Sequence, residues 1–551
     1  MEGYLRSKNL GVTKINQKKY NKAVEDFNNV IDSLTPQNEE ETILKCNCLL
    51  NRSFCYTQLH KYTEAQEDAN TVIKIYNDYH HKGKQNNPLT PILSLAHVRL
   101  GECYEAQLEY LEAFQEYSEG NRINKKGEAQ KSFQSLLKKL NIPIIDPKDK
   151  QLQSFSQIIN NFLNEKSLNE SLESLINTLH NETKLEAAVI TKINSTDSPN
   201  IIYGIIQLYH DNKTLINNSL IALRLLVESG VSSVWNGYIV IRNVMKRYES
   251  DLDIIGNSIK LLRMIPRNLY SHLSKEGFIP LITKSLKIIN DHGEIEGAFF
   301  LLFQIASSPS LLVELINQEI IEIILEKKTM GALLLLSKLS LVPELLKQAE
   351  TLGAIDWIFE MLKKENINEA EIIAASLIFS RILLRKISNE EKENRILKAN
   401  KIFDALAPLL MKNTKNEEVV ATTFAAFSIA VNYAPEKAKE FKLIRLASVL
   451  LAMHMKMEDV AQNLVAFLYE AANSGLLDDV KEVKPALPTV LKALSQYPSN
   501  EAIVERSVAL AYLLDHPNKM DMLRAALMQF NNSNFLKVFI AQNGILSAQK
   551  K

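Results

Sequence analysis

From about residue 215 to residue 512, the chain repeats one pattern of apolar and polar positions. A small residue opens each copy, a run of apolar residues follows, and a polar residue ends it before two more apolar positions. The copies end at eight residues, called rungs below: Arg224, Arg263, Gln304, Lys338, Arg381, Ser428, Glu470 and Tyr512. Their steps are 39, 41, 34, 43, 47, 42 and 42 residues. A period near forty predicts stacked helical repeats.

A second pattern tests the first. An amphipathic helix carries apolar residues at i, i+3 and i+7, as at Ile279, Ile282 and Leu286. Sets of this kind start at Ile279, Ile355, Ile402, Ile444 and Leu487. Their steps of 76, 47, 42 and 43 residues follow those of the rungs. The two registers agree, so they predict at least two helices in each repeat.

Two short segments resemble armadillo repeats. The sequences Gly277-Phe278-Ile279-Pro280-Leu281-Ile282 and Gly353-Ala354-Ile355 are similar to the start of the second armadillo helix. The segment from Ala374 to Arg381 is similar to the third helix. The resemblance covers about residues 215–517 and implies an armadillo-like superhelix.

A different repeat occupies the first 120 residues. Tyrosine starts the segments Tyr20-Asn21-Lys22-Ala23, Tyr62-Thr63-Glu64-Ala65 and Tyr110-Leu111-Glu112-Ala113. A small residue stands nine positions before each tyrosine, at Gly11, Ser53 and Gly101. This pattern resembles the tetratricopeptide repeat (TPR), in which small residues let paired helices approach closely and aromatic residues fill the seam.

These patterns predict an all-α protein, an α-solenoid in which a TPR array precedes an armadillo-like superhelix. An amphipathic helix over about 125–140 is expected to cap the TPR array. Pro143 and Pro147 then interrupt helix formation. The expected domains are a TPR domain with its capping helix at 1–141, a linker at 142–151 and an armadillo-like domain at 152–551.

Composition narrows the range of functions. The 64 Lys and Arg residues equal the 64 Asp and Glu residues, which argues against wholesale binding to nucleic acid or to a membrane. The N-terminus lacks the apolar core of a signal peptide, and we expect a cytoplasmic protein. Four cysteines lie in predicted helices without metal-ligand spacing, and they are expected to be small buried thiols.

We find no sequence signature of catalysis. The motifs of nucleotide, zinc-protease and serine-hydrolase sites do not occur, and the ten histidines show no ligand spacing. We therefore expect no enzyme activity, no cofactor and no metal. Helical solenoids expose long concave surfaces, so the expected function is protein binding.

The resemblance to TPR domains implies a candidate peptide groove. Many such domains hold the acidic C-terminal tail of heat-shock protein 90 or 70 with a clamp of lysines, asparagines and an arginine. Lys8, Asn51 and Arg99 match three clamp positions, whereas Val12 and Leu95 replace an asparagine and a lysine. The alternative is that the three polar residues are ordinary surface and packing residues.

The rungs suggest a second candidate groove. Armadillo repeats often use an asparagine at this position to hold an extended peptide, and no rung is an asparagine. Four of the first five rungs are basic, so Arg224, Arg263, Gln304, Lys338 and Arg381 predict binding of an acidic segment. The alternative is that each rung is a polar residue where its helix emerges.

The order of the two repeat types resembles the UCS myosin co-chaperones and the TPR and armadillo proteins of dynein assembly. This resemblance implies a co-chaperone or assembly factor that connects a chaperone with a client protein. The alternative is a scaffold or trafficking adaptor without a chaperone link.

Overall fold

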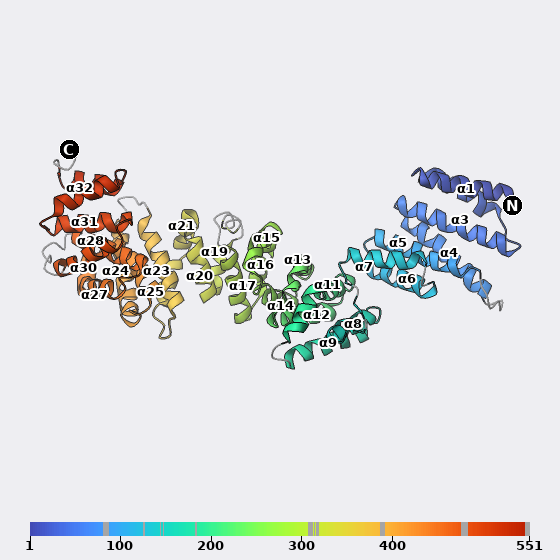
Figure 1. Cartoon of the computed structure of the whole chain (residues 1–551), viewed down its shortest axis with the longest axis horizontal. Helices are drawn as coiled ribbons and strands as arrows, with labels where there is room; N and C mark the ends of the chain where they lie inside the picture. Colours follow the sequence, from blue (N-terminus) through green and yellow to red (C-terminus); the bar gives the residue numbers. More distant parts are fainter. Residues whose placement is uncertain are drawn as a thin grey trace. The chain divides into compact units, whose positions relative to one another are not determined.

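A computed structural model gives the fold of residues 1–545, except for 81–87, 125–126, 144, 147, 182–184, 307–311, 313–314, 316–318, 386–391 and 475–482. The described residues form α-helices joined by turns and short 3-10 segments, and no strand occurs among them (Figure 1). The prediction of an all-α solenoid is therefore confirmed. The chain forms two compact units, Met1–Ile265 and Pro266–Lys551.

The helices of the first unit are α1 (Glu2–Asn16), α2 (Tyr20–Ser33), α3 (Glu39–Gln58), α4 (Tyr62–His80), α5 (Thr90–Ala106), α6 (Tyr110–Ile123), α7 (Glu128–Lys139), α8 (Gln153–Asn160), α9 (Glu165–Asn181), α10 (Ala187–Ser195), α11 (Pro199–Leu208), α12 (Lys213–Glu228), α13 (Tyr238–Arg247) and α14 (Leu252–Leu262).

The helices of the second unit are α15 (Tyr270–Lys275), α16 (Phe278–Ile288), α17 (His292–Ile305), α19 (Ile320–Lys327), α20 (Met330–Leu339), α21 (Pro343–Thr351), α22 (Ala354–Met361), α23 (Glu369–Leu384), α24 (Lys392–Lys412), α25 (Glu417–Ala430), α26 (Pro435–Glu440), α27 (Leu443–Met453), α28 (Glu458–Asn473), α30 (Leu487–Gln496), α31 (Glu501–Leu513), α32 (Lys519–Gln529) and α33 (Asn534–Gln542).

The first six helices pack as the three predicted TPR pairs, α1 with α2, α3 with α4 and α5 with α6. A Cβ atom on Gly11 would lie 2.7 Å from the Phe27 ring, and one on Gly101 would lie 2.4 Å from the Tyr117 ring. Ser53 is fully buried, and its hydroxyl donates a hydrogen bond of 2.7 Å to the Ala65 carbonyl. Each small residue therefore permits the close approach of its helix pair, as predicted. Helix α7 packs on α5 and α6 as the capping helix.

Eight helices, here called the spine helices, each carry one rung: α12, α14, α17, α20, α23, α25, α28 and α31, with Arg263 directly after α14. Within the second unit, each spine helix packs on the next one along the chain. In the first unit, α12 packs on α14 in the same way. The sequence period thus corresponds to one layer of the stack.

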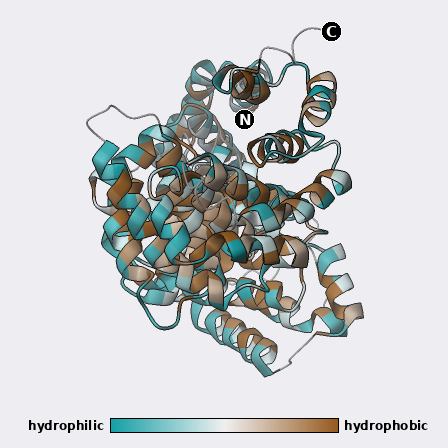
Figure 2. Cartoon of the chain, turned by 90° about the vertical axis from the view of Figure 1, so that its left-hand side faces the viewer, coloured by the Kyte–Doolittle hydropathy of each residue, from teal (hydrophilic) through white to brown (hydrophobic). Residues whose placement is uncertain are grey.

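The second apolar register also lies where the sequence predicts it. Its five starting residues are all buried and belong to α16, α22, α24, α27 and α30. Gly277 and Gly353 precede α16 and α22 with φ values of +75° and +87°, a left-handed conformation that favours glycine. These glycines let the chain turn sharply into the second helix of their repeats. Figure 2 colours the residues by hydropathy, and hydrophobic and hydrophilic residues occur together on many of the helices in view.

All four cysteines are free and buried, which confirms the expectation of small buried thiols. Burial raises the pKa of Cys46 and of Cys55 to about 12. It raises the pKa of Cys48 and of Cys103 to about 11. At neutral pH these thiols therefore stay protonated, which suppresses their nucleophilic and metal-binding chemistry.

The predicted linker at 142–151 lies within the first compact unit. Ile142 and Ile145 are buried, and the Ile142 side chain packs against Gly204 on α11. Phe114 on α6 also contacts Phe162, at 5.8 Å between ring centroids. The TPR array is thus packed on the helices that follow it, and a domain boundary at 142–151 stays a prediction.

Limited trypsin digestion tests that boundary. Lys148 and Lys150 are exposed, as are Arg263 and Arg267 on either side of the division between the compact units. If the linker separates two domains, the first stable fragments should end at Lys148 or Lys150. Mass spectrometry of the fragments would identify the cut. First fragments ending at Arg263 or Arg267 instead would contradict the predicted boundary.

A matched pair of glycine substitutions tests the helix seams. In Gly101→Ala, the new methyl group meets the ring of the buried Tyr117, whose hydroxyl donates a hydrogen bond of 3.0 Å to Glu105. Such overpacking should lower the free energy of unfolding by about 1–3 kcal/mol. Gly3→Ala is the control, because no atom lies within 4 Å of its new methyl group. The control should be neutral or gain up to about 1 kcal/mol from helix propensity. Equal urea midpoints for the two variants would contradict the prediction.

Candidate protein-binding surfaces

The five predicted groove residues of the TPR array all come from the first helix of a pair. Lys8 and Val12 lie on α1, Asn51 on α3, and Leu95 and Arg99 on α5, and each is half-buried. Val12 packs against a cluster formed mainly by α2 and α3, and Leu95 packs against a cluster formed by α3, α4 and α5. Part of the surface of Val12 and of Leu95 is therefore buried against neighbouring helices.

The helices that carry Lys8 and Arg99, α1 and α5, both pack on α3, which carries Asn51. The positive charge of Lys8 counteracts the burial that raises the pKa of Cys48. Asn51 follows Cys48 by three residues on the same face of the helix. One turn further on, the Arg99 guanidinium lies over the Phe54 ring, 5.1 Å from its centroid. Lys8 and Arg99 thus come from the two helices that flank the helix of Asn51.

Arg99 already forms ion pairs with two acidic side chains of the same chain. Its Nη1 atom lies 2.7 Å from Glu102 and 3.8 Å from Glu128 at the start of α7. Burial raises the pKa of the Glu102 carboxyl, and the charge of Arg99 opposes that rise. The buried Arg99 Nε has no hydrogen-bond partner within the described chain. A carboxylate entering this groove would compete with two internal carboxylates for Arg99.

A neighbouring ion pair joins the helices around the groove. Arg52 donates two hydrogen bonds to Asp68 on α4, at 2.8 and 2.7 Å, and a third of 2.7 Å to Asn28 on α2. Burial raises the pKa of Asp68, and the bonds from Arg52 oppose that rise. Arg52 thus holds α2, α3 and α4 in register next to Asn51. The sequence analysis missed this pair because its members lie 16 residues apart on different helices.

The two rungs of the first unit differ in their surroundings. Arg224 is a quarter exposed and pairs with Glu228 one turn later on α12, at 2.5 Å. Arg263 is exposed directly after the end of α14. Arg263 therefore presents its charge to solvent, whereas Arg224 is largely neutralised.

The rungs of the second unit contact neighbouring helices. The Tyr270 hydroxyl donates a hydrogen bond of 2.9 Å to Gln304, and the Lys338 ammonium lies 5.3 Å from the centroid of Phe303. Arg381 donates to the Ser337 carbonyl and to the Ser340 hydroxyl at the end of α20. Burial lowers the pKa of its guanidinium. These rungs connect one repeat to another, which limits the charge they offer to a partner.

The described part of the chain contains neither a cluster of metal-ligating side chains nor a helix able to span a membrane. No group of three or more His, Cys, Asp or Glu side chains is placed to hold a metal ion there. None of the helices there has the length and apolarity needed to cross a membrane.

Comparison with known proteins supports a helical-repeat fold. No model of a known protein family matches the chain. A stretch of 111 residues is 36% identical to the heat shock protein STI1 of Saccharomyces cerevisiae, and it covers 20% of this chain and 16% of STI1. The chain therefore matches only a small part of that relative.

Solved structures give the same fold. A chain from a study of the interaction between cadherin and beta-catenin matches 95% of this chain over its whole length, with 13% identity and a TM-score of 0.56. The myosin chaperone UNC-45 from C. elegans, solved with an Hsp90 peptide, covers 99% of this chain and 73% of its own at 13% identity. Its TM-score of 0.22 is too low to indicate the same arrangement of helices. The chain is an α-solenoid of TPR-like and armadillo-like repeats.

A pair of arginine substitutions tests the role of the rungs. Arg381→Ala removes donors from the Ser337 carbonyl and the Ser340 hydroxyl, both in largely buried surroundings. The free energy of unfolding should fall by about 1–3 kcal/mol. Arg263→Ala, at an exposed position, should change it by less than about 0.5 kcal/mol. Urea unfolding followed by circular dichroism measures both. A neutral Arg381→Ala variant would show that this rung does not hold the repeats together.

Proposed function

We propose that this protein is a non-enzymatic adaptor of the cytoplasm that connects a heat-shock chaperone with a client protein. The TPR array would bind the acidic C-terminal tail of heat-shock protein 90 or 70. The armadillo-like repeats would bind the client through an acidic segment. The observation that carries the proposal is that Lys8 and Arg99 lie on α1 and α5, which both pack on the helix that carries Asn51.

The chemistry of the groove favours a carboxylate ligand. Lysine, asparagine and arginine are all hydrogen-bond donors, and charged donors form the stronger bonds to carboxylates. Val12 and Leu95 add apolar surface beside these donors, which favours a tail carrying an apolar residue next to its acidic ones. The similarity to a heat shock protein over 111 residues supports the same assignment.

Two carboxylates of the chain itself compete with the chaperone tail for Arg99, so we expect the tail to bind weakly. Glu102 and Glu128 must yield part of the guanidinium before a tail carboxylate can pair with it. The same competition supports the second candidate function, a scaffold or trafficking adaptor that does not contact a chaperone. In that case, the pairing of Arg99 with Glu128 would serve to fix the capping helix α7.

Peptide binding by the full-length chain distinguishes the two functions. Calorimetry would use the last ten residues of heat-shock protein 90, with a C-terminally amidated peptide as the control for the terminal carboxylate. Arg99→Ala should weaken binding about tenfold or more, because a charged hydrogen bond contributes about 1.5–3 kcal/mol. The double variant Glu102→Gln/Glu128→Gln should tighten binding, because it removes the competing charges.

Several outcomes would contradict the chaperone link. They include no binding by the unchanged protein, equal binding of the amidated peptide, and an Arg99→Ala variant that binds as the parent does. A loss of helix in circular dichroism would identify a folding defect. The opposite shifts expected for Arg99→Ala and for the glutamine pair cannot both come from such a defect.

A further inference from the structure

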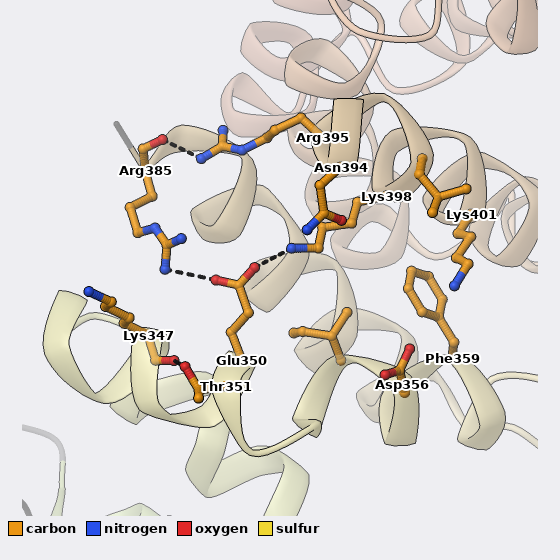
Figure 3. Close-up of a pocket in the computed structure, with 12 residues that line it drawn as sticks. Lys347, Glu350, Thr351, Asp356, Phe359, Arg385, Asn394, Arg395, Lys398 and Lys401 are labelled. Atoms are coloured by element: carbon orange, nitrogen blue, oxygen red, sulfur yellow. Dashed lines mark hydrogen bonds and ion pairs between the residues drawn. The ribbon is translucent and has the colours of Figure 1, made fainter. Parts of the chain in front are cut away.

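The second unit contains a cation-rich pocket that the sequence analysis did not find. It has a volume of about 410 Å³ and lies among α21, α22 and α24, with Arg385 at the end of α23 (Figure 3). Five basic side chains line it, namely Lys347, Arg385, Arg395, Lys398 and Lys401. Its two acidic side chains are Glu350 and Asp356, which leaves a surplus of three positive charges. The chain as a whole has no net charge, so this surplus is local.

An internal carboxylate shows how the pocket holds an anion. The Glu350 carboxylate lies between Arg385, at 2.7 Å, and Lys398 (Figure 3). The three residues come from α21, the end of α23 and α24. Two cations from separate elements thus converge on one carboxylate, in the way expected of a carboxylate-binding site.

A buried arginine positions this arrangement. Arg395 is 4% exposed, and its guanidinium donates to the carbonyls of Leu383 and Arg385 at the end of α23. Its guanidinium also lies over the Tyr433 ring, 5.8 Å from its centroid. These contacts fix the backbone from which the Arg385 side chain extends to Glu350. Arg395 therefore stabilises the backbone that positions Arg385 at the pocket.

Two lysines remain without an acidic partner among the described residues. Lys347 and Lys401 are both exposed, and they lie on opposite sides of Glu350 (Figure 3). The Lys401 ammonium lies 5.8 Å from the centroid of Phe359. Lys347 and Lys401 lie on the two sides of the Glu350 carboxylate, which is already paired. A ligand with more than one negative charge could therefore pair with both lysines.

The pocket also offers apolar surface. Ile355 and Phe359 line it and are largely buried, and Leu397 lines it with 55% of its surface exposed. A free phosphate would gain nothing from these side chains. A peptide that alternates acidic and apolar residues would use both the cations and the apolar wall.

We propose that this pocket binds an acidic segment of a partner protein, with carboxylates at Lys347 and Lys401 and an apolar side chain against Ile355 and Phe359. The proposal rests on the proposed function only in taking an acidic client segment as the ligand. It places that ligand in the α21–α24 pocket, whose lining residues include none of the rungs. It does not depend on a chaperone bound to the TPR array.

A designed peptide tests the site in the full-length chain. The probe is a fluorescein-labelled peptide with the sequence Leu-Glu-Glu-Leu-Asp-Glu, compared by anisotropy with Leu-Gln-Gln-Leu-Asn-Gln. The acidic peptide should bind about tenfold more tightly, and its affinity should fall as salt rises. The double variant Lys347→Glu/Lys401→Glu should weaken binding about tenfold or more. The control is Lys456→Glu/Lys537→Glu, at exposed lysines outside the pocket, and it should bind as the parent does.

Two further variants separate the alternatives. Glu350→Gln should tighten binding, because Arg385 and Lys398 lose their internal carboxylate; a folding defect would not produce this gain. Arg263→Glu should have no effect on peptide binding. A loss of binding in Arg263→Glu but not in the pocket variant would assign the segment to the rungs.

Equal binding of the two peptides would overturn the proposal, as would equal losses in the pocket and control variants. So would binding of inorganic phosphate that displaces the peptide at equal concentration, because the pocket would then be an anion site without a role for its apolar wall.

Discussion

Each repeat of this chain has an apolar face that only its neighbours can bury, and the fold depends on that constraint. Phe424 on α25 contacts Phe427 on the same helix at 5.8 Å and Phe467 on α28 at 5.1 Å. Phe427 in turn stacks on Phe403 of α24 at 4.8 Å. The four rings are fully buried and join α24, α25 and α28. Burying a phenylalanine contributes about 1.5–3 kcal/mol, so removing one repeat would withdraw several such contributions from the next.

Polar residues decide where each spine helix begins. In seven of the eight, the residue before the helix accepts a hydrogen bond from the backbone amide three positions on: Asn212, Asp251, Asp291, Thr329, Asn368, Asn416 and Asn500. Helix α28 is the exception, because it follows Met457. Such caps satisfy amides that a helix leaves unpaired at its start. They also fix the register in which each apolar face meets its neighbour.

The repeat types and the helices could be predicted from the sequence because their signals are short spacings and a regular period. Gly11 and Gly101 could be recognised from their spacing to a tyrosine, and the rungs from their period. The candidate sites were harder to predict because they depend on partners far apart in the chain. The spacing of Arg99 and Glu102 would have revealed their pairing as helix neighbours, whereas Glu128 reaches Arg99 from another helix. Likewise, no period relates Glu350 to Lys398, which are 48 residues apart. Arg381 donates hydrogen bonds to Ser337 and Ser340 at the end of α20, and a repeat length does not encode these contacts.

The buried cysteines make the protein convenient for spectroscopy. Maleimide and methanethiosulfonate reagents react with thiolates, and all four native thiols are both enclosed and held in their protonated form. A single cysteine introduced on an exposed helical turn would thus be the reactive one without removal of the native four. Pairs of dyes or spin labels could then be attached to the two compact units of the native chain, and the distances between them would report how those units are arranged in solution.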